Sequence, residues 1–120
     1  MGLFSRHSKS SFPWIQLTDQ SQLNAALTGS EQKSTLFFKH STRCGISSMV
    51  LNRFEASWKA TDTCDFYLVD LLAYRTISDE MASLFHIQHQ SPQLILIRNH
   101  DVIYHASHDS IIASDFENRI

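Results

Sequence analysis

The order of apolar segments along the chain restricts its fold more than any other feature. From Trp14 onward, short continuous apolar runs alternate with segments whose apolar residues recur at every third or fourth position. The first pattern predicts a strand and the second an amphipathic helix. Strands that alternate with helices build a parallel sheet, because each helix carries the chain back across a sheet face.

Three strand–helix units are predicted before a final hairpin. The strands are expected at residues 14–17, 35–39 and 66–72. The first helix follows the polar residues 18–21, and its apolar residues are Leu23, Ala26 and Leu27, with Gly29 at its end. The second follows Cys44 and presents one apolar face made of Ile46, Met49, Val50, Phe54 and Trp58. The third is capped by Thr76 with Asp79, and its buried stripe is Ile77, Met81, Leu84 and Phe85.

The last part of the chain predicts antiparallel strands. After the polar residues 86–91 and Pro92, residues 94–97 form a continuous apolar strand, residues 99–101 a turn, and residues 102–105 a partner strand. A short helix carrying Ile112 and Phe116 closes the chain. The predicted fold is therefore α/β, in the order βαβαβαββα, with a central mixed sheet flanked by helices.

Composition and charge narrow the class of protein. A chain of 120 residues with 42% hydrophobic residues fits one domain, expected at residues 12–120 behind a loose arm at residues 1–11. The net charge of -2 gives no indication of nucleic acid or a membrane surface as a partner. No apolar run approaches the roughly 20 residues of a membrane span, and the N-terminus has no signal-peptide core. We therefore expect a cytoplasmic protein.

The two cysteines, Cys44 and Cys64, do not form a Cys-x-x-Cys pair or a disulfide scaffold. The seven histidines are scattered, so we expect no metal site. Cys64 precedes a buried strand, which favours a structural role, although it is a conceivable resolving thiol if it lies near Cys44.

Cys44 stands where a strand, a tight polar loop and a helix meet. The amide groups at a helix start favour negative charge, and Lys39, His40 and Arg43 make the loop basic. Both features favour the thiolate, the form in which a cysteine attacks. A lone cysteine is nevertheless more often a small buried hydrophobe.

The residues around Cys44 predict chemistry that uses a single thiol. Gly45 removes a side chain beside the sulfur and lets another backbone approach. Ser47 is able to donate a hydrogen bond to a thiolate but not to resolve a mixed disulfide, so the next step falls to another thiol. Ser91-Pro92 opens a strand after a polar loop, where a cis peptide bond occurs in some proteins, although the local sequence alone favours trans. The Ser91 backbone would then pair with an extended thiol substrate.

The combination of several segments resembles a known family. These segments are Phe38-Lys39-His40-Ser41-Thr42 leading into Cys44, then Ile46-Ser47, Ser91-Pro92-Gln93, and His105-Ala106-Ser107-His108. Together they resemble the YtxJ family, the monothiol bacilliredoxins of the thioredoxin-like superfamily, from about Trp14 to the C-terminus.

The resemblance implies a thioredoxin-like fold with Cys44 as the catalytic thiol and Pro92 as a cis-proline facing it. It implies removal of bacillithiol from S-thiolated client proteins, with bacillithiol as co-substrate, no bound cofactor, and a second thiol or a reductase that regenerates Cys44. The residues expected to contact the substrate are Thr42, Arg43, Gly45, Ser47, Ser91 and Pro92. Bacillithiol is acidic, so Lys39 and Arg43 are candidates to bind it. The family usually has proline where this chain has Gly45, which leaves the identity of the thiol open.

Two other functions remain open. The run Cys44-Gly45-Ile46-Ser47 is similar to the Cys-Gly-Phe-Ser signature of monothiol glutaredoxins, which share iron–sulfur clusters between two chains with glutathione. That family has a Gly-Gly pair after the proline strand, whereas residues 99–108 here contain no glycine. The other alternative is a non-enzymatic thioredoxin-fold module that binds partners and uses Cys44 only structurally.

Overall fold

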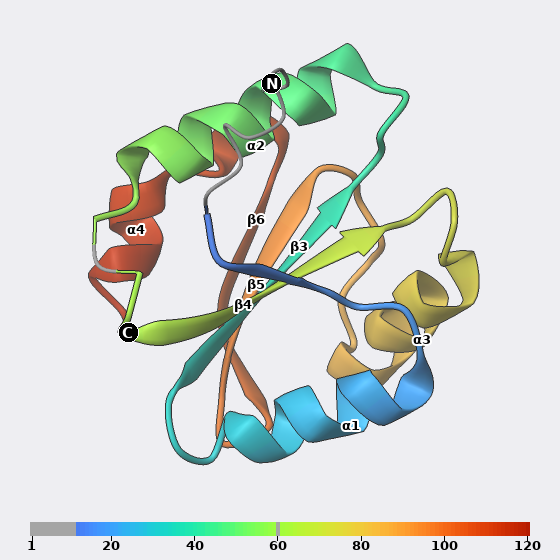
Figure 1. Cartoon of the computed structure of the whole chain (residues 1–120), viewed down its shortest axis with the longest axis vertical. Helices are drawn as coiled ribbons and strands as arrows, with labels where there is room; N and C mark the ends of the chain where they lie inside the picture. The colour runs from blue at the N-terminus through green and yellow to red at the C-terminus, as the bar shows by residue number, and fades with distance from the viewer. Residues whose placement is uncertain (1–11, 60) are drawn as a thin grey trace, which may run out of the picture.

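The computed structural model describes residues 12–59 and 61–120, so the expected arm at residues 1–11 lies outside the described part. The strands are β2 (Trp14–Gln16), β3 (Ser34–His40), β4 (Cys64–Asp70), β5 (Gln93–Arg98) and β6 (Asp101–Ser107). The helices are α1 (Gln20–Gly29), α2 (Gly45–Ser57), α3 (Arg75–Phe85), the 3-10 helix η2 (His108–Ser110) and α4 (Ala113–Glu117). The predicted order of strands and helices is confirmed (Figure 1).

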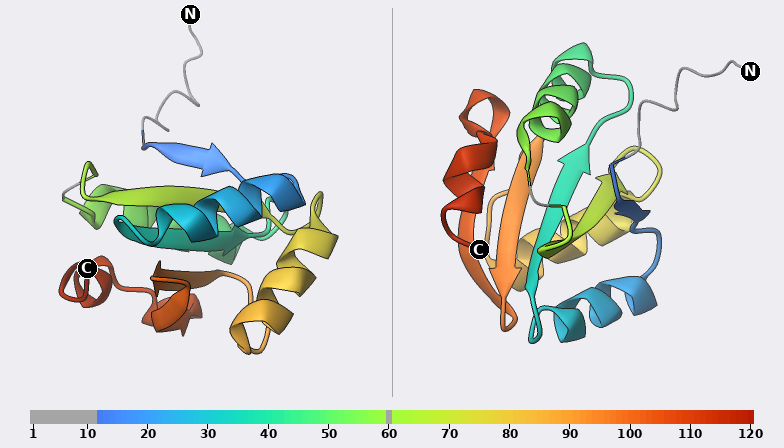
Figure 2. Two further views of the ribbon diagram at one scale, coloured as in Figure 1. Left: turned by 90° about the horizontal axis from the view of Figure 1, so that it is seen from below. Right: turned by 60° about the vertical axis from the view of Figure 1, so that its left-hand side comes forward.

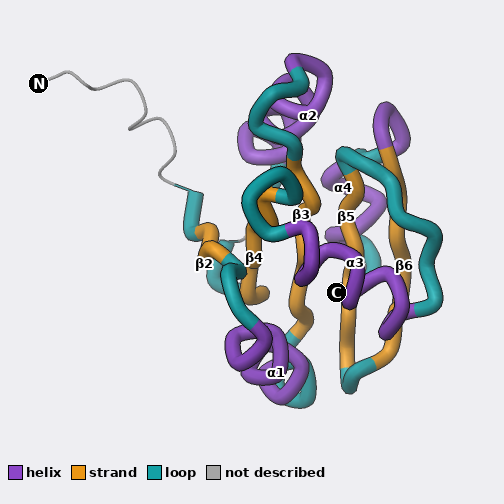
Figure 3. Tube along the Cα trace, turned by 90° about the vertical axis from the view of Figure 1, so that its right-hand side faces the viewer, coloured by secondary structure: helices purple, strands orange, loops and turns teal. Residues whose placement is uncertain are grey.

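The strands form one mixed sheet in the order β2-β4-β3-β5-β6. Figure 3 shows them side by side in this order. Strand β4 pairs in parallel with β2 and β3, whereas β5 pairs antiparallel with β3 and β6. The two parallel pairs follow from the crossover helices, and the two antiparallel pairs follow from the late hairpin.

Two hydrophobic cores fill the space between the sheet and its helices. Helices α2 and α4 lie on one side of the sheet and α1 and α3 on the other (Figure 1 and Figure 2). The first core joins residues such as Phe54 of α2 and Phe116 of α4 to Phe38 of β3. The second joins Met81 of α3 to Phe37. Strand β3 is buried along its whole length, so residues at its end are enclosed on both faces.

The predicted apolar face of α2 is confirmed for Val50, Phe54 and Trp58, which are buried, but not for its first turn. Ile46 and Met49 are 57% and 62% exposed, and the buried residues are Ser47, Val50 and Phe54. Both sets recur at helical spacing, and the sheet covers the stripe that contains Ser47. The apolar residues at the first turn therefore face outward beside Cys44.

Three smaller expectations were also wrong. Tyr74 is the N-cap of α3, with no side-chain cap bond, so Thr76 and Asp79 do not form the predicted capping pair. Leu84 is exposed, because the buried face of α3 passes through Ser78 and Phe85 instead. Ile112 is exposed and precedes α4 as its N-cap.

The hairpin between β5 and β6 closes without a glycine. Asn99 and His100 both have positive φ angles, 53° and 68°, as a tight hairpin turn requires. The Asn99 amide donates to the Ser30 carbonyl at 2.8 Å, and the His100 amide donates to Ser30 Oγ at 3.0 Å. The C-cap residue of α1 therefore holds the turn in place.

Candidate active site

Four chain segments meet at one end of the sheet. Strands β3 and β4 are parallel, so their carboxyl ends lie together, with His40 paired to Asp70. Strand β5 is antiparallel to β3 and begins at the same end, where Gln93 pairs with both Lys39 and Ser107. The loop that carries Cys44, the loop after β4, the Ser91–Pro92 turn and the end of β6 therefore surround one site.

Cys44 is the N-cap residue of α2, as the sequence predicted. Its backbone is extended, and its side chain makes no capping hydrogen bond and is partly exposed. The Cys44 amide donates to the Ser41 carbonyl at 3.1 Å, and its own carbonyl accepts from the Ser48 amide at 3.1 Å. The backbone is thus fixed while the sulfur stays available. Arg43 is exposed, and the first turn of α2 has no acidic residue.

The space next to Gly45 is open. Apart from its chain neighbours and the backbone of its own helix, no atom of the described residues lies within 4 Å of where a Cβ would stand, and Gly45 is exposed. No packing constraint therefore requires a glycine at this position. A side chain at this position would meet open space.

Ser47 is fully buried and bonded away from the thiol. Its Oγ lies 2.7 Å from His40 Nδ1 and accepts from the Ser41 amide at 3.2 Å. Burial lowers the pKa of His40, and Asp70 opposes that shift only in part, so the imidazole is favoured in its neutral form. The neutral imidazole and the Ser47 hydroxyl share one hydrogen bond, whose donor depends on the imidazole tautomer. Among the hydrogen bonds of the described residues, none joins Ser47 to Cys44, so the expected bond to the thiolate is wrong.

Lys39 is enclosed in the protein rather than presented on the loop. It is 0% exposed and lies on the α1–α3 side of the sheet, because it alternates with Phe38 and His40. Its Nζ donates to the Ser78 carbonyl at 3.0 Å and lies 3.4 Å from His89 Nδ1. Burial lowers the pKa of Lys39 to about 8, with Asp79 acting in the opposite direction. The expectation that Lys39 makes the loop surface basic or binds bacillithiol is therefore wrong.

The Ser91–Pro92 peptide bond is cis. Pro92 is buried, and its carbonyl accepts from the His108 amide at 3.0 Å, which joins the turn to the end of β6. Ser91 Oγ and Gln93 Oε1 are buried, and neither has a hydrogen-bond partner among the described residues.

Cys64 lies far from Cys44. It is the first residue of β4 and pairs with Ser34, six residues before His40 on the parallel strand β3. At the rise of a strand, this separation is about 20 Å, several times the reach of a disulfide. Cys64 is buried, and burial raises the pKa of its thiol. It is a structural residue and does not lie where it would resolve a disulfide at Cys44.

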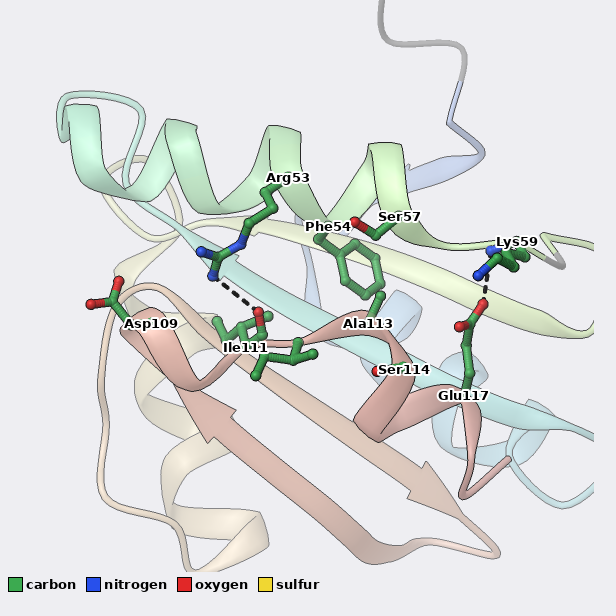
Figure 4. A pocket seen from close by; sticks show the side chains of 10 residues that line it. Arg53, Phe54, Ser57, Lys59, Asp109, Ile111, Ala113, Ser114 and Glu117 are labelled. Carbon is green, nitrogen blue, oxygen red and sulfur yellow. Dashed lines mark hydrogen bonds between the residues drawn. The ribbon is translucent and has the colours of Figure 1, made fainter.

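Away from Cys44, the described residues include a pocket but no cluster of metal ligands. No cluster of three or more histidine, cysteine, aspartate or glutamate residues suited to a metal exists within residues 12–59 and 61–120. In the same ranges, no helix is both long and apolar enough to cross a membrane. A pocket of about 390 Å³ lies between the second half of α2 and the η2–α4 segment (Figure 4). Arg53 there donates to the Ile111 carbonyl at 3.2 Å, and the pocket includes none of the predicted site residues.

The sheet order, the cysteine at the start of α2 and the proline at the start of β5 define a thioredoxin-fold protein. A solved structure described as having a thioredoxin fold matches with 24% identity and a TM-score of 0.77, covering 89% of this chain and 93% of that one. Thioredoxin from Trypanosoma brucei brucei matches with 18% identity and a TM-score of 0.67, covering 92% and 89%. Thioredoxin from Malassezia sympodialis matches with 19% identity and a TM-score of 0.66, covering 86% and 84%.

The particular family follows from the sequence. Residues 15–116 match the family described as monothiol bacilliredoxin BrxC, and the chain belongs to this family. The predicted fold class and the resemblance to monothiol bacilliredoxins are both confirmed. Family and fold together support a role of the thiol oxidoreductase type.

Proposed function

We propose that this protein removes bacillithiol, or a similar low-molecular-weight thiol, from mixed disulfides on proteins, with Cys44 as the catalytic thiol. The observation that carries the proposal is the state of Cys44: a partly exposed cysteine at a helix start whose side chain makes no capping bond. The second thiol, Cys64, is about 20 Å away along the strands. This arrangement supports chemistry that uses one thiol at the site.

The reaction runs in two exchange steps. The Cys44 thiolate attacks the bacillithiol sulfur of the mixed disulfide, a bond forms between these two sulfurs, and the client sulfur leaves as a thiolate that takes a proton from water. A second thiol, itself attacking as a thiolate, then displaces Cys44 and forms a disulfide with bacillithiol. That disulfide is finally reduced by a cellular reductase. Each exchange step replaces one disulfide with another, and the reductase supplies the two electrons and protons that convert the last disulfide into two thiols.

The residues around Cys44 have different proposed roles in these steps. Arg43 and Thr42 are exposed beside the sulfur and are the proposed contacts for the acidic groups of bacillithiol. The open space at Gly45 and the backbone at Ser91 and Pro92 are the proposed contacts for the extended chain around the disulfide. Ser47 is buried, so its proposed part is to hold the loop and not to touch the substrate.

The proposed partners are S-thiolated client proteins, a low-molecular-weight thiol and a reductase, with bacillithiol as co-substrate and no bound cofactor. The proposed location is the cytoplasm, where such thiols are kept reduced.

The test uses a client protein with one cysteine carrying bacillithiol, and follows release of the free client thiol. Wild type and Cys64→Ser should release it at the same rate, whereas Cys44→Ser should not release it. The same client carrying glutathione measures the preference for the small thiol. Release that survives Cys44→Ser, or no release by the wild type from either client, would overturn the proposal in favour of a binding module.

A further inference from the structure

Lys39 is a fully buried amine five residues before Cys44, and the proposed exchange steps do not use it. Enclosing an ammonium group costs free energy, and an apolar side chain of similar volume is often as stable or more so at such a place. A core position of this kind therefore needs an explanation other than stability. The contacts of the Lys39 amine provide one.

The amine joins three parts of the chain. Its Nζ donates to the carbonyl of Ser78 in α3 and lies 3.4 Å from Nδ1 of His89, in the loop before β5. Ser78 Oγ lies 3.3 Å from the same His89 nitrogen. An ammonium group has only donors, so Nδ1 of His89 acts as the acceptor and carries no proton.

The charges around His89 agree with that assignment. Burial lowers the pKa of His89 most, the Lys39 amine lowers it further, and Arg75 adds to the effect, while Asp79 opposes it. Lys39 comes from β3, and Arg75 and Asp79 come from α3. The neutral imidazole is thus the favoured state beside the Lys39 amine.

His89 lies two residues before Ser91, in the loop that leads to the cis peptide bond. A second side-chain bond, from Gln93 Nε2 to the Gln88 carbonyl at 3.1 Å, connects this loop only to the start of β5. The contact between His89 and Lys39 instead ties the loop to β3, the strand that ends at the Cys44 loop. One buried side chain therefore links both walls of the site.

We propose that Lys39, acting through His89, is a positioning residue that fixes the Ser91–Pro92 turn relative to Cys44. The inference rests on the proposed function, because the turn matters only if a disulfide substrate lies between it and the sulfur. Misplacing a substrate-binding wall by about 1 Å is able to cost up to about 100-fold in rate.

The test compares two reactions of the same thiol. Alkylation of Cys44 by iodoacetamide needs no contact with the turn, whereas exchange with the bacillithiol-carrying client does. Lys39→Met and His89→Leu should lower kcat/KM for exchange by about 10- to 100-fold. Alkylation of Cys44 should stay unchanged in both variants. His89→Asn, which keeps an acceptor atom near the position of Nδ1, should restore exchange. Lys33→Met, at the other end of the sheet, is the matched control and should change neither reaction.

Equal kcat/KM for thiol–disulfide exchange in Lys39→Met, His89→Leu and wild type would overturn the inference. A parallel loss of thiol–disulfide exchange and of Cys44 alkylation would also overturn it. Failure of the proposed function gives a different result, because the wild type itself would then release no client thiol. In that case, amide hydrogen exchange at residues 89–93 decides the inference. Faster hydrogen exchange at these residues in Lys39→Met and His89→Leu supports the inference, and unchanged protection refutes it.

Discussion

Nδ1 of His40 and Oγ of Ser47 lie 2.7 Å apart, and both side chains are buried beneath the loop that carries Cys44. The contact joins the last residue of β3 to the first turn of α2. Because the Ser41 amide donates to the same Oγ, one hydroxyl group joins the residues on both sides of the loop.

Replacing Ser47 with alanine should therefore destabilise the protein. The change leaves His40 Nδ1 and the Ser41 amide without their partner, and an unsatisfied buried group of this kind costs about 1–3 kcal/mol. Chemical denaturation measures the free energy of unfolding. Ser48→Ala, at the half-buried neighbouring position, should change it by no more than about 0.5 kcal/mol. Equal effects at the two positions would contradict the role assigned to the Ser47 hydroxyl.

The Lys39 amine should make stability rise with alkaline pH. Its pKa is about 8 in the folded chain against 10.5 ordinarily, so the unfolded chain binds more protons between those two values. The free energy of unfolding should increase across this window by up to about 3 kcal/mol from this group. Lys39→Met should lack that increase in denaturation measured at both ends of the window. Burial raises the pKa of Cys64 and of Tyr67, but their contributions cancel in the difference between wild type and variant.

The orientation of α2 predicts a large difference between two of its apolar residues. Phe54→Ala should lower the free energy of unfolding by about 3–5 kcal/mol, because it leaves a cavity in the core. Met49→Ala, at a side chain that is 62% exposed, should change it by about 0.5 kcal/mol or less. Thermal or chemical denaturation of the two variants gives the comparison. A larger loss for Met49→Ala than for Phe54→Ala would contradict the observed orientation of α2.

The two cysteines should differ sharply in reactivity. In the folded protein, an alkylating reagent should label Cys44 and leave Cys64 unlabelled until the chain is unfolded, because Cys64 is buried and its pKa is raised. Mass spectrometry of peptides after labelling under native and denaturing conditions measures both. A peptide in which Cys44 and Cys64 of one chain are joined would contradict the separation given by the strand register.

The sequence was sufficient for the order of elements and for the position of Cys44. Local patterns carry that information: the apolar run that becomes β3, the polar loop, and the helical spacing that follows. The same spacing placed Met49 and Phe54 on one apolar face of α2, although Met49 is exposed and Phe54 is buried. Only the packing against the sheet distinguishes them.

No local sequence pattern indicated the contacts of Lys39. Ser78 and His89 are 39 and 50 residues away along the chain. A lysine at the end of an apolar run reads as the solvent-exposed end of a strand. In the fold, both faces of β3 are covered, so the run continues into the interior through Lys39 and His40.

The strand register that separates Cys44 from Cys64 also determines the reaction order with which oxidised Cys44 is reduced. Because Cys64 lies about 20 Å along the strands from the end of β3 that leads to Cys44, the two cysteines form no internal crosslink, so every disulfide at Cys44 contains an atom from another molecule. The rate of leaving the oxidised state then scales with the concentration of an external thiol, with no first-order path of its own. Dilution alone would prolong the lifetime of the oxidised adduct.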